Sequence, residues 1–301
     1  MQNLITLAMI LTPLFIGYFI RLPKSCMVFT DRLLNVLIYV ILTLIGVSLS
    51  QVRNLGSQID FIAFMAVALA ICVLGANLLI LMWFDRKYPW QNHINHNGKK
   101  ARIGIGGSIK QLACIFFGLA FGKLMSGIWL PPESTSTYAL MLLILLVGIQ
   151  LGGSSMTLRQ VLLNRRGVQI SLLLILSSFL GGILFCILAP DVSFGQALAL
   201  SSGFGWYSLS GIVMTEAYGP VWGSIALLND LIREFFALIF IPLIMRRYPS
   251  AAIGIGGATS MDFTLPVIQS AGGLAAVPLA ISFGFIINLV APFLMLVFSN
   301  L

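Results

Sequence analysis

The stretch from Val221 to Met245 reads VWGSIALLNDLIREFFALIFIPLIM, which is apolar over the length of a membrane span yet carries three charges near its middle. A charged side chain at bilayer depth costs about 2.5–3.5 kcal/mol or more. At about 100° per residue, the three charged positions and a neighbouring amide fall on one arc of a helix. We therefore expect this arc to face the protein interior or a water-filled cavity. Its members are Asn229, Asp230, Arg233 and Glu234.

The remainder of the 301-residue chain is also apolar, with 59% hydrophobic and 9% charged residues. Soluble domains carry about 25% charged residues. Helices satisfy their own backbone polar groups in lipid, and these segments lack the alternation of an outer-membrane barrel. The composition therefore predicts an all-α polytopic membrane protein, a single transporter domain over residues 1–301. We attribute the net charge of +8 to cytoplasmic loops, so we expect the lipid bilayer and no nucleic acid as a partner.

Apolar runs of spanning length recur along the chain and predict eight transmembrane helices. Two further segments, 192–219 and 250–273, are apolar but interrupted by small and polar residues. We expect both to be re-entrant or broken. The eight runs lie at about 3–20, 33–50, 60–84, 109–130, 137–153, 168–189, 221–245 and 276–299.

The loops between these runs alternate between rich and poor in Lys and Arg. Basic loops stay in the cytoplasm, which predicts that the N-terminus and the C-terminus both lie outside. Arg246 and Arg247 reach the cytoplasmic side only if segment 192–219 returns to the outer face that it enters from. The same argument makes 250–273 re-entrant from the cytoplasmic face. An arrangement with ten crossings, which breaks the charge rule once, stays open as the alternative.

Two internal echoes favour an inverted-repeat transporter architecture. Residues 44–49 (LIGVSL) resemble residues 146–151 (LVGIQL), and three spans separate the two copies. More faintly, residues 202–204 and Asn229 match residues 261–263 and Asn288 at a constant offset. The candidate repeat units are 1–84 with 109–189 as a scaffold, and 192–245 with 250–299 as re-entrant-plus-helix pairs.

The first broken segment, Ser201 to Gly211, reads SSGFGWYSLSG. Its glycines and serines free the backbone from a helix and offer hydroxyl and carbonyl oxygens. Packing of small residues between helices explains the glycines alone, but less easily a cluster that also holds aromatic residues. We take Ser202, Gly203, Trp206, Tyr207, Ser208 and Ser210 as candidate binding residues, with Ser201 and Ser202 as an alternative sodium site.

The second broken segment, Gly256 to Pro266, reads GGATSMDFTLP and contains a lone carboxylate, Asp262, in apolar surroundings. Proline is favoured at the first position of a helix, so a half-helix should begin here with Thr264 or Leu265 near its cap. Its positive dipole end would then point inward. We take Asp262, Ser260 and Thr264 as candidate site residues. The alternative is an Asp in a cytoplasmic loop that merely caps a helix.

The apolar segments contain three acids, Asp230, Glu234 and Asp262, and one base, Arg233, which can differ in function. A buried ion network can be purely architectural. We predict that Asp230 and Arg233 form a supporting pair, while Glu234 and Asp262 are the working acids. Burial in a low dielectric favours the protonated form of a carboxyl group, which allows it to exchange a proton near neutral pH. The four cysteines and two histidines lack metal-ligand spacing, so we expect no cofactor and no resident metal.

The two broken segments together resemble the bacterial lysine exporter family of the LysO type. The matching motifs are SGFGWYSLSG (202–211), Gly219-Pro220, Asn229-Asp230, Arg233-Glu234, GATSMDFTLP (257–266) and LNRRG (163–167). The resemblance covers nearly the whole chain and implies export of L-lysine and close analogues across the bacterial inner membrane. It also implies that the family's intramembrane acids correspond to Glu234 and Asp262.

Lysine carries two ammonium groups and one carboxylate, which suits buried acids together with Arg233 or a half-helix N-terminus. We expect secondary active transport by alternating access, with H+ as the coupling ion and Na+ as the alternative. One rival is a monovalent cation/proton antiporter of similar build, and another is a passive channel. An intramembrane hydrolase using Ser208 or Ser210 lacks a nearby histidine base, so we do not expect an enzyme. A homodimer is compatible with the sequence, but no residue selects it.

Overall fold

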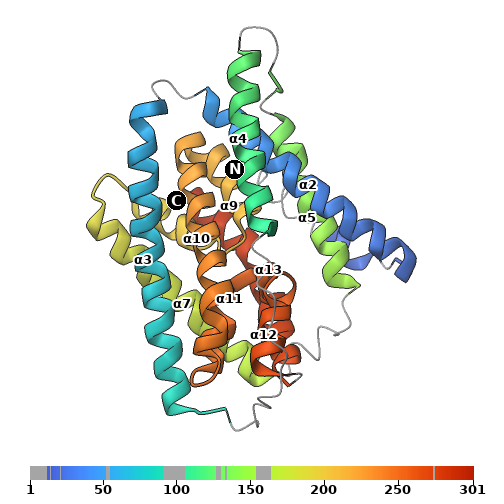
Figure 1. Cartoon of the computed structure of the whole chain (residues 1–301), viewed down its shortest axis with the longest axis vertical. Coiled ribbons are helices and arrows are strands. Elements are labelled where there is room, and N and C mark those ends of the chain that lie inside the picture. The colour runs from blue at the N-terminus through green and yellow to red at the C-terminus, as the bar shows by residue number, and fades with distance from the viewer. Residues whose placement is uncertain are drawn as a thin grey trace.

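In the computed structural model, every regular element in the described part of the chain is a helix (Figure 1). The structure describes residues 12–13, 15–20, 22–51, 55–90, 106–126, 130–132, 134–153, 164–273 and 275–301. The helices are α2 (Lys24–Ser50), α3 (Leu55–Lys87), α4 (Gly106–Met125), α5 (Ser134–Gly152), α7 (Arg165–Leu188), α8 (Phe194–Ser201), α9 (Tyr207–Tyr218), α10 (Pro220–Ile244), α11 (Pro249–Gly256), the 3-10 helix η1 (Gly257–Met261), α12 (Leu265–Gly272) and α13 (Ala276–Ser299).

Within these ranges, four helices are long and apolar enough to cross a membrane by length and composition. They are Cys26–Ser50, Gln58–Lys87, Arg165–Leu188 and Ala276–Ser299. The apolar stretches of α4 and α5 are shorter, and α10 spans 25 residues but carries three charges. Most of the expected first span, 3–20, lies outside the described residues, although 15–19 are helical. The all-helical class is confirmed, and four of the eight predicted spans meet the criterion for length and composition.

The helices pack in two groups, and a cavity lies where the groups meet. In one group α2 contacts both α4 and α5, and in the other α3, α7, α10 and α13 surround the short helices. The first group depends on glycine: a Cβ at Gly46 would overlap the carbonyl oxygen of Ile115, and one at Gly17 would overlap that of Leu145. Small residues allow such close backbone approach between apolar helices.

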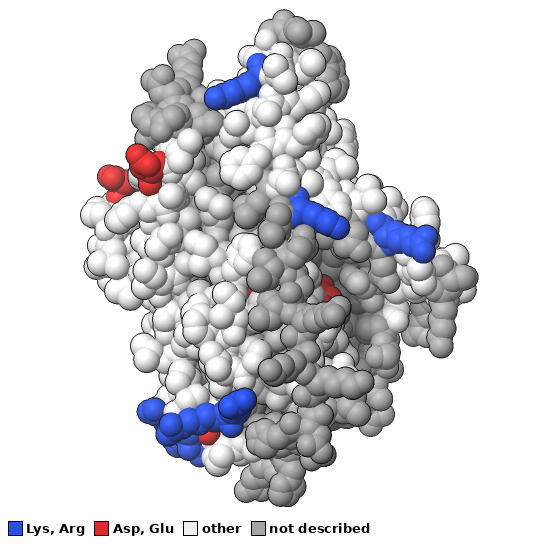
Figure 2. Space-filling model, in the orientation of Figure 1, with Lys and Arg blue, Asp and Glu red and all other residues white. Residues whose placement is uncertain are grey.

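Basic side chains gather at the end of the molecule that is lowest in Figure 2. There Arg166 donates to Asp85 at 2.7 Å, and the second Asp85 oxygen accepts the N–H of Ala251 at 3.0 Å. Arg86 donates to the hydroxyl of Tyr248 at 3.1 Å. These contacts bring the end of α3 and the beginnings of α7 and α11 together, so this basic end also holds the end of α10.

The two broken segments approach the middle from different ends. Around α8 and α9, a Cβ at Gly195 would lie 2.9 Å from the carbonyl oxygen of Phe298, and the Tyr218 hydroxyl donates to the carbonyl of Ser299 at 3.3 Å. Both ends of this segment therefore lie beside the C-terminal end of α13. The segment of α11 and α12 begins at the basic end and finishes there too, because a Cβ at Gly272 would lie 3.0 Å from Sδ of Met245.

Candidate functional site

The break between α8 and α9 is held by the carboxylate of Asp230. This fully buried side chain accepts hydrogen bonds from Ser210 Oγ at 2.6 Å, Asn229 Nδ2 at 3.0 Å and the N–H of Gly205 at 3.1 Å. Phe204 and Gly205 both adopt positive φ, 49° and 89°, which turns the chain sharply before α9 begins. The arrangement fixes Asp230 as an anchor of the break.

The break between α11 and α12 contacts the first one directly. The N–H of Ala258 donates to the carbonyl oxygen of Phe204 at 2.9 Å. Gly257 has φ +57°, and a Cβ there would overlap the same carbonyl. Thr264 is the N-cap of α12 and a proline occupies its first turn, which confirms the helix start predicted from Pro266.

Arg233 lies behind both breaks. A Cβ at Gly205 would be 2.9 Å from Arg233 Cδ, and one at Gly257 would be 3.6 Å from it. The side chain is 2% exposed, and Nη1 has no hydrogen-bond partner among the described residues. Arg233 and Asp230 attract each other electrostatically, but the ion pair within the described ranges is Arg166 with Asp85. Asp230 and Arg233, predicted from the sequence to form a supporting pair, therefore attract each other without a direct ion pair. The hydrogen-bond donors of Asp230 are instead Gly205, Ser210 and Asn229.

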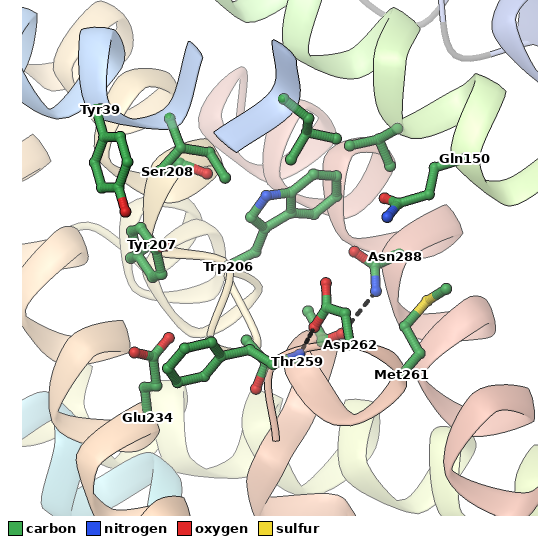
Figure 3. A pocket seen from close by; sticks show the side chains of 16 residues that line it. Tyr39, Gln150, Trp206, Tyr207, Ser208, Glu234, Thr259, Met261, Asp262 and Asn288 are labelled. Atoms are coloured by element: carbon green, nitrogen blue, oxygen red, sulfur yellow. Dashed lines mark hydrogen bonds between the residues drawn. The ribbon is translucent and has the colours of Figure 1, made fainter. Parts of the chain in front are cut away.

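A cavity of about 280 Å³ opens beside the two breaks (Figure 3). It is lined by α2, α5, the start of α9, α10, η1 with the residues after it, and α13. No Lys or Arg occurs among the described residues that line it. Its polar lining consists of Tyr39, Gln150, Trp206, Tyr207, Ser208, Glu234, Thr259, Asp262 and Asn288.

Glu234 and Asp262 both line this cavity but differ in accessibility. Glu234 is 2% exposed, whereas Asp262 is exposed to the cavity. Figure 3 shows them on different sides of the space, and both lie close enough to Tyr207 to interact with it electrostatically. One Asp262 oxygen, Oδ1, accepts the N–H of Phe263. Two carboxylates and no basic side chain occur among the described lining residues, an arrangement whose chemistry suits a cation.

The candidate residues from the sequence divide into two sets. One set lines the cavity: Trp206, Tyr207, Ser208, Glu234 and Asp262. The remaining candidates lie in or beside the two breaks and do not line the cavity. They are Ser202, Gly203, Asn229, Asp230, Arg233, Ser210, Ser260 and Thr264. Ser201 and Ser202 both donate to the carbonyl of Leu198, at 3.0 and 2.7 Å. All four residues of the α10 arc are buried, as predicted.

Sequence reasoning missed four polar residues of the lining: Tyr39, Gln150, Thr259 and Asn288. Gln150 and Asn288 stood in the internal echoes, as polar residues inside apolar helices. That was a usable signal, because a polar side chain at membrane depth needs a partner. Tyr39 gave no such signal, since a tyrosine in an apolar helix is common at membrane interfaces.

The family model described as "Lysine exporter LysO" matches residues 112–299. The protein named Lysine exporter LysO in Escherichia coli is 43% identical over 297 residues, covering 97% of this chain and 98% of that relative. A proposed lysine exporter of Haemophilus influenzae is 46% identical over 190 residues, covering 63% of this chain and 96% of that relative. No solved structure matches the chain.

The matched residues include both broken segments, all of α10 and the acids Asp230, Glu234 and Asp262. With 97% of its length aligned to an exporter, this chain belongs to the LysO family of lysine exporters, a family of transporters and not of enzymes.

Proposed function

We propose that this protein exports L-lysine across the bacterial inner membrane and that Glu234 and Asp262 bind its cationic groups. One observation carries the proposal: two carboxylates from different elements line one cavity whose described lining has no basic side chain. The cavity volume of about 280 Å³ is at the small end of ligand pockets, which hold roughly 300–1,000 Å³. That size suits a single amino acid.

Lysine offers a separate ammonium group for each acid. In Figure 3 Glu234 and Asp262 lie on different sides of the cavity, and the indole ring of Trp206 lies above both of them in this view. An aromatic face attracts ammonium groups and also covers an alkyl chain. We therefore propose that the two carboxylates bind the two ends of the substrate and that Trp206 contacts the part between them.

The substrate carboxylate needs a donor, and the N-terminus of α9 offers one. Ser208, the second residue of this helix, lines the cavity, and its buried Oγ has no hydrogen-bond partner among the described residues. The first N–H groups of a helix have no partner inside it and favour an anion. Arg233 was the other candidate, but it does not appear in the lining. We propose the carboxylate at Ser208, with Arg233 balancing the buried negative charge from behind.

We propose that segments 192–219 and 250–273 are re-entrant and enter from opposite membrane faces. Both ends of the first lie beside the C-terminal end of α13, and both ends of the second lie at the basic end. The positive-inside rule makes the basic end cytoplasmic, which leaves the C-terminus outside and supports an N-terminus outside as well. Non-helical backbone at membrane depth is tolerated where it lines a cavity, which is where the two breaks lie.

An inverted repeat of 1–84 and 109–189 is supported by matching helix contacts. Gly46 is equivalent to Gly148 in the first echo, and Gly17 is equivalent to Gly118 if the alignment includes a short gap. A Cβ at Gly17 would lie 3.1 Å from the Cα of Gly148, and a Cβ at Gly46 would lie 3.1 Å from the Cα of Gly118. The contact of Gly17 with Gly148 thus has an equivalent in the contact of Gly118 with Gly46, in which each residue is replaced by its counterpart in the other repeat. A pseudo-two-fold axis in the membrane plane requires such a pair of contacts.

We propose H+ as the coupling ion, exchanged at Glu234 or Asp262 during alternating access, with Na+ as the alternative. Both acids line the same cavity, so a coupling ion that enters it can reach either one. A channel or a monovalent cation/proton antiporter of similar build would share the acids but not the selectivity for lysine.

Counterflow of labelled lysine in proteoliposomes across a pH gradient, with and without sodium, tests the proposal. We expect lysine exchange that responds to the pH gradient and lysine-stimulated proton flux. Proton flux that responds to monovalent cations and ignores lysine would favour the antiporter instead. Lysine movement that cannot be driven against its gradient would favour a channel.

A further inference from the structure

Asn288 on α13 presents one oriented hydrogen-bond acceptor to the cavity. Its Nδ2 donates to the carbonyl oxygens of Ala258 and Gly284, each at 2.8 Å. Backbone carbonyls only accept, so the amino group must face both of them. The alternative orientation would place Oδ1 against two carbonyl oxygens, and these contacts therefore settle which side of the amide carries the oxygen.

The Oδ1 atom of Asn288 consequently points away from η1. Asn288 lines the cavity, and its bonds to η1 and α13 use Nδ2, which leaves Oδ1 on the cavity side. Figure 3 shows the oxygen turned away from the dashed bond, toward the space beside Asp262 and below Gln150. A neutral acceptor with a fixed direction therefore lies next to an anionic one.

The same helix seats Asp262. A Cβ at Gly284 would lie 2.7 Å from the Cβ of Met261, so α13 contacts the residue before Asp262 directly. Asn288 holds the start of η1 through Ala258, and Asp262 directly follows η1. The relative placement of the Asn288 and Asp262 oxygens is thus fixed by packing of α13 against η1.

Two acceptors side by side require a ligand that donates. A primary ammonium group has three N–H donors and one charge, so it can bond to both oxygens while Asp262 neutralises it. We propose that Asn288 Oδ1 accepts a hydrogen bond from one ammonium group of the substrate next to Asp262, and thereby selects for N–H donors rather than for charge alone. This inference rests on the proposed lysine export and assigns one end of that same site.

Lysine trimethylated at Nε or at Nα tests the inference, because trimethylation keeps the positive charge and removes every N–H at one end. Binding to the purified full-length protein is measured by competition with labelled lysine. Hydrogen bonds to charged groups predict that one isomer binds wild type about 10- to 100-fold more weakly than lysine does. In Asn288→Leu the affinity ratio between lysine and that isomer should shrink by about tenfold. Whether the Nε or the Nα isomer is affected identifies which ammonium group of lysine Asn288 contacts.

Asn77→Leu is the matched control, since Asn77 is a buried amide that accepts from Ser177 and does not line the cavity. It should leave both ratios unchanged. Asn288→Ser gives the same readout if Asn288→Leu does not fold. If the affinity ratios for both isomers are the same in the Asn288 variants as in wild type, and wild type binds lysine, the inference is overturned and the proposed function is not. Absence of lysine binding in wild type would overturn the proposed function and this assignment together.

Discussion

The N–H of Ala258 donates to the carbonyl oxygen of Phe204 at 2.9 Å, which joins the two broken segments at their non-helical residues. Each break thereby satisfies a backbone group that its own helix has lost. At membrane depth such groups have no water to bond, so the contact stabilises both breaks at once. The cavity that contains Glu234 and Asp262 lies beside this junction, and the site therefore depends on both segments being in place.

Replacing Glu234 by Gln should abolish coupled lysine export while the protein still inserts and folds. The amide keeps the size of the side chain but removes both the negative charge and the exchangeable proton. Lysine counterflow in proteoliposomes measures the effect, and monodisperse elution in detergent checks folding. Glu216→Gln is the matched control because Glu216 is exposed at the end of α9. Undiminished coupled transport by the Glu234 variant would remove this residue from the mechanism.

Asp230→Ala should act on stability rather than on substrate recognition. It leaves the donors of Gly205, Ser210 and Asn229 without their acceptor inside the protein. Hydrogen bonds to a charged group contribute about 1.5–3 kcal/mol each, so we expect a marked fall in thermal stability. Asp230→Asn, which retains one acceptor oxygen, should fall less. Equal melting temperatures for wild type and the Ala variant would contradict the role of Asp230 as an anchor.

The sequence predicted the arc of α10 and the start of α12 because both depend on local rules, helical periodicity and the preference of proline for the first turn. It could not specify the partners that are chosen in three dimensions. Asp230 and Arg233 were expected to form a supporting pair; they attract each other, but the hydrogen bonds to Asp230 come from Gly205, Ser210 and Asn229. Asn288 and Gln150 reach the cavity from different helices, and no local pattern specifies that two distant helices face the same space.

Gly257→Ala should disrupt the junction between the breaks. A Cβ at this position overlaps the carbonyl oxygen of Phe204, and φ of +57° is unfavourable for alanine. Strain of this kind alone costs about 1–3 kcal/mol. Gly219→Ala separates the two effects, because Gly219 has φ of +89° and a Cβ there would meet no atom within 4 Å. We expect lysine transport to be lost in Gly257→Ala and retained in Gly219→Ala, whereas equal transport would argue against a tight junction.

Single cysteines can test whether the broken segments return to the face they enter from. After replacement of Cys26, Cys72, Cys114 and Cys186 by Ser, the changes Asp191→Cys and Glu216→Cys place single exposed cysteines before α8 and in the last turn of α9. Because both ends of that segment lie beside the same end of α13, an impermeant thiol reagent should label both from the periplasmic side. Arg247→Cys and Gln269→Cys, around α11 and α12, should be labelled only after the membrane is opened. Labelling of Asp191→Cys and Glu216→Cys from opposite sides would mean that segment 192–219 crosses the membrane completely, which contradicts its re-entrance and favours the arrangement with ten crossings.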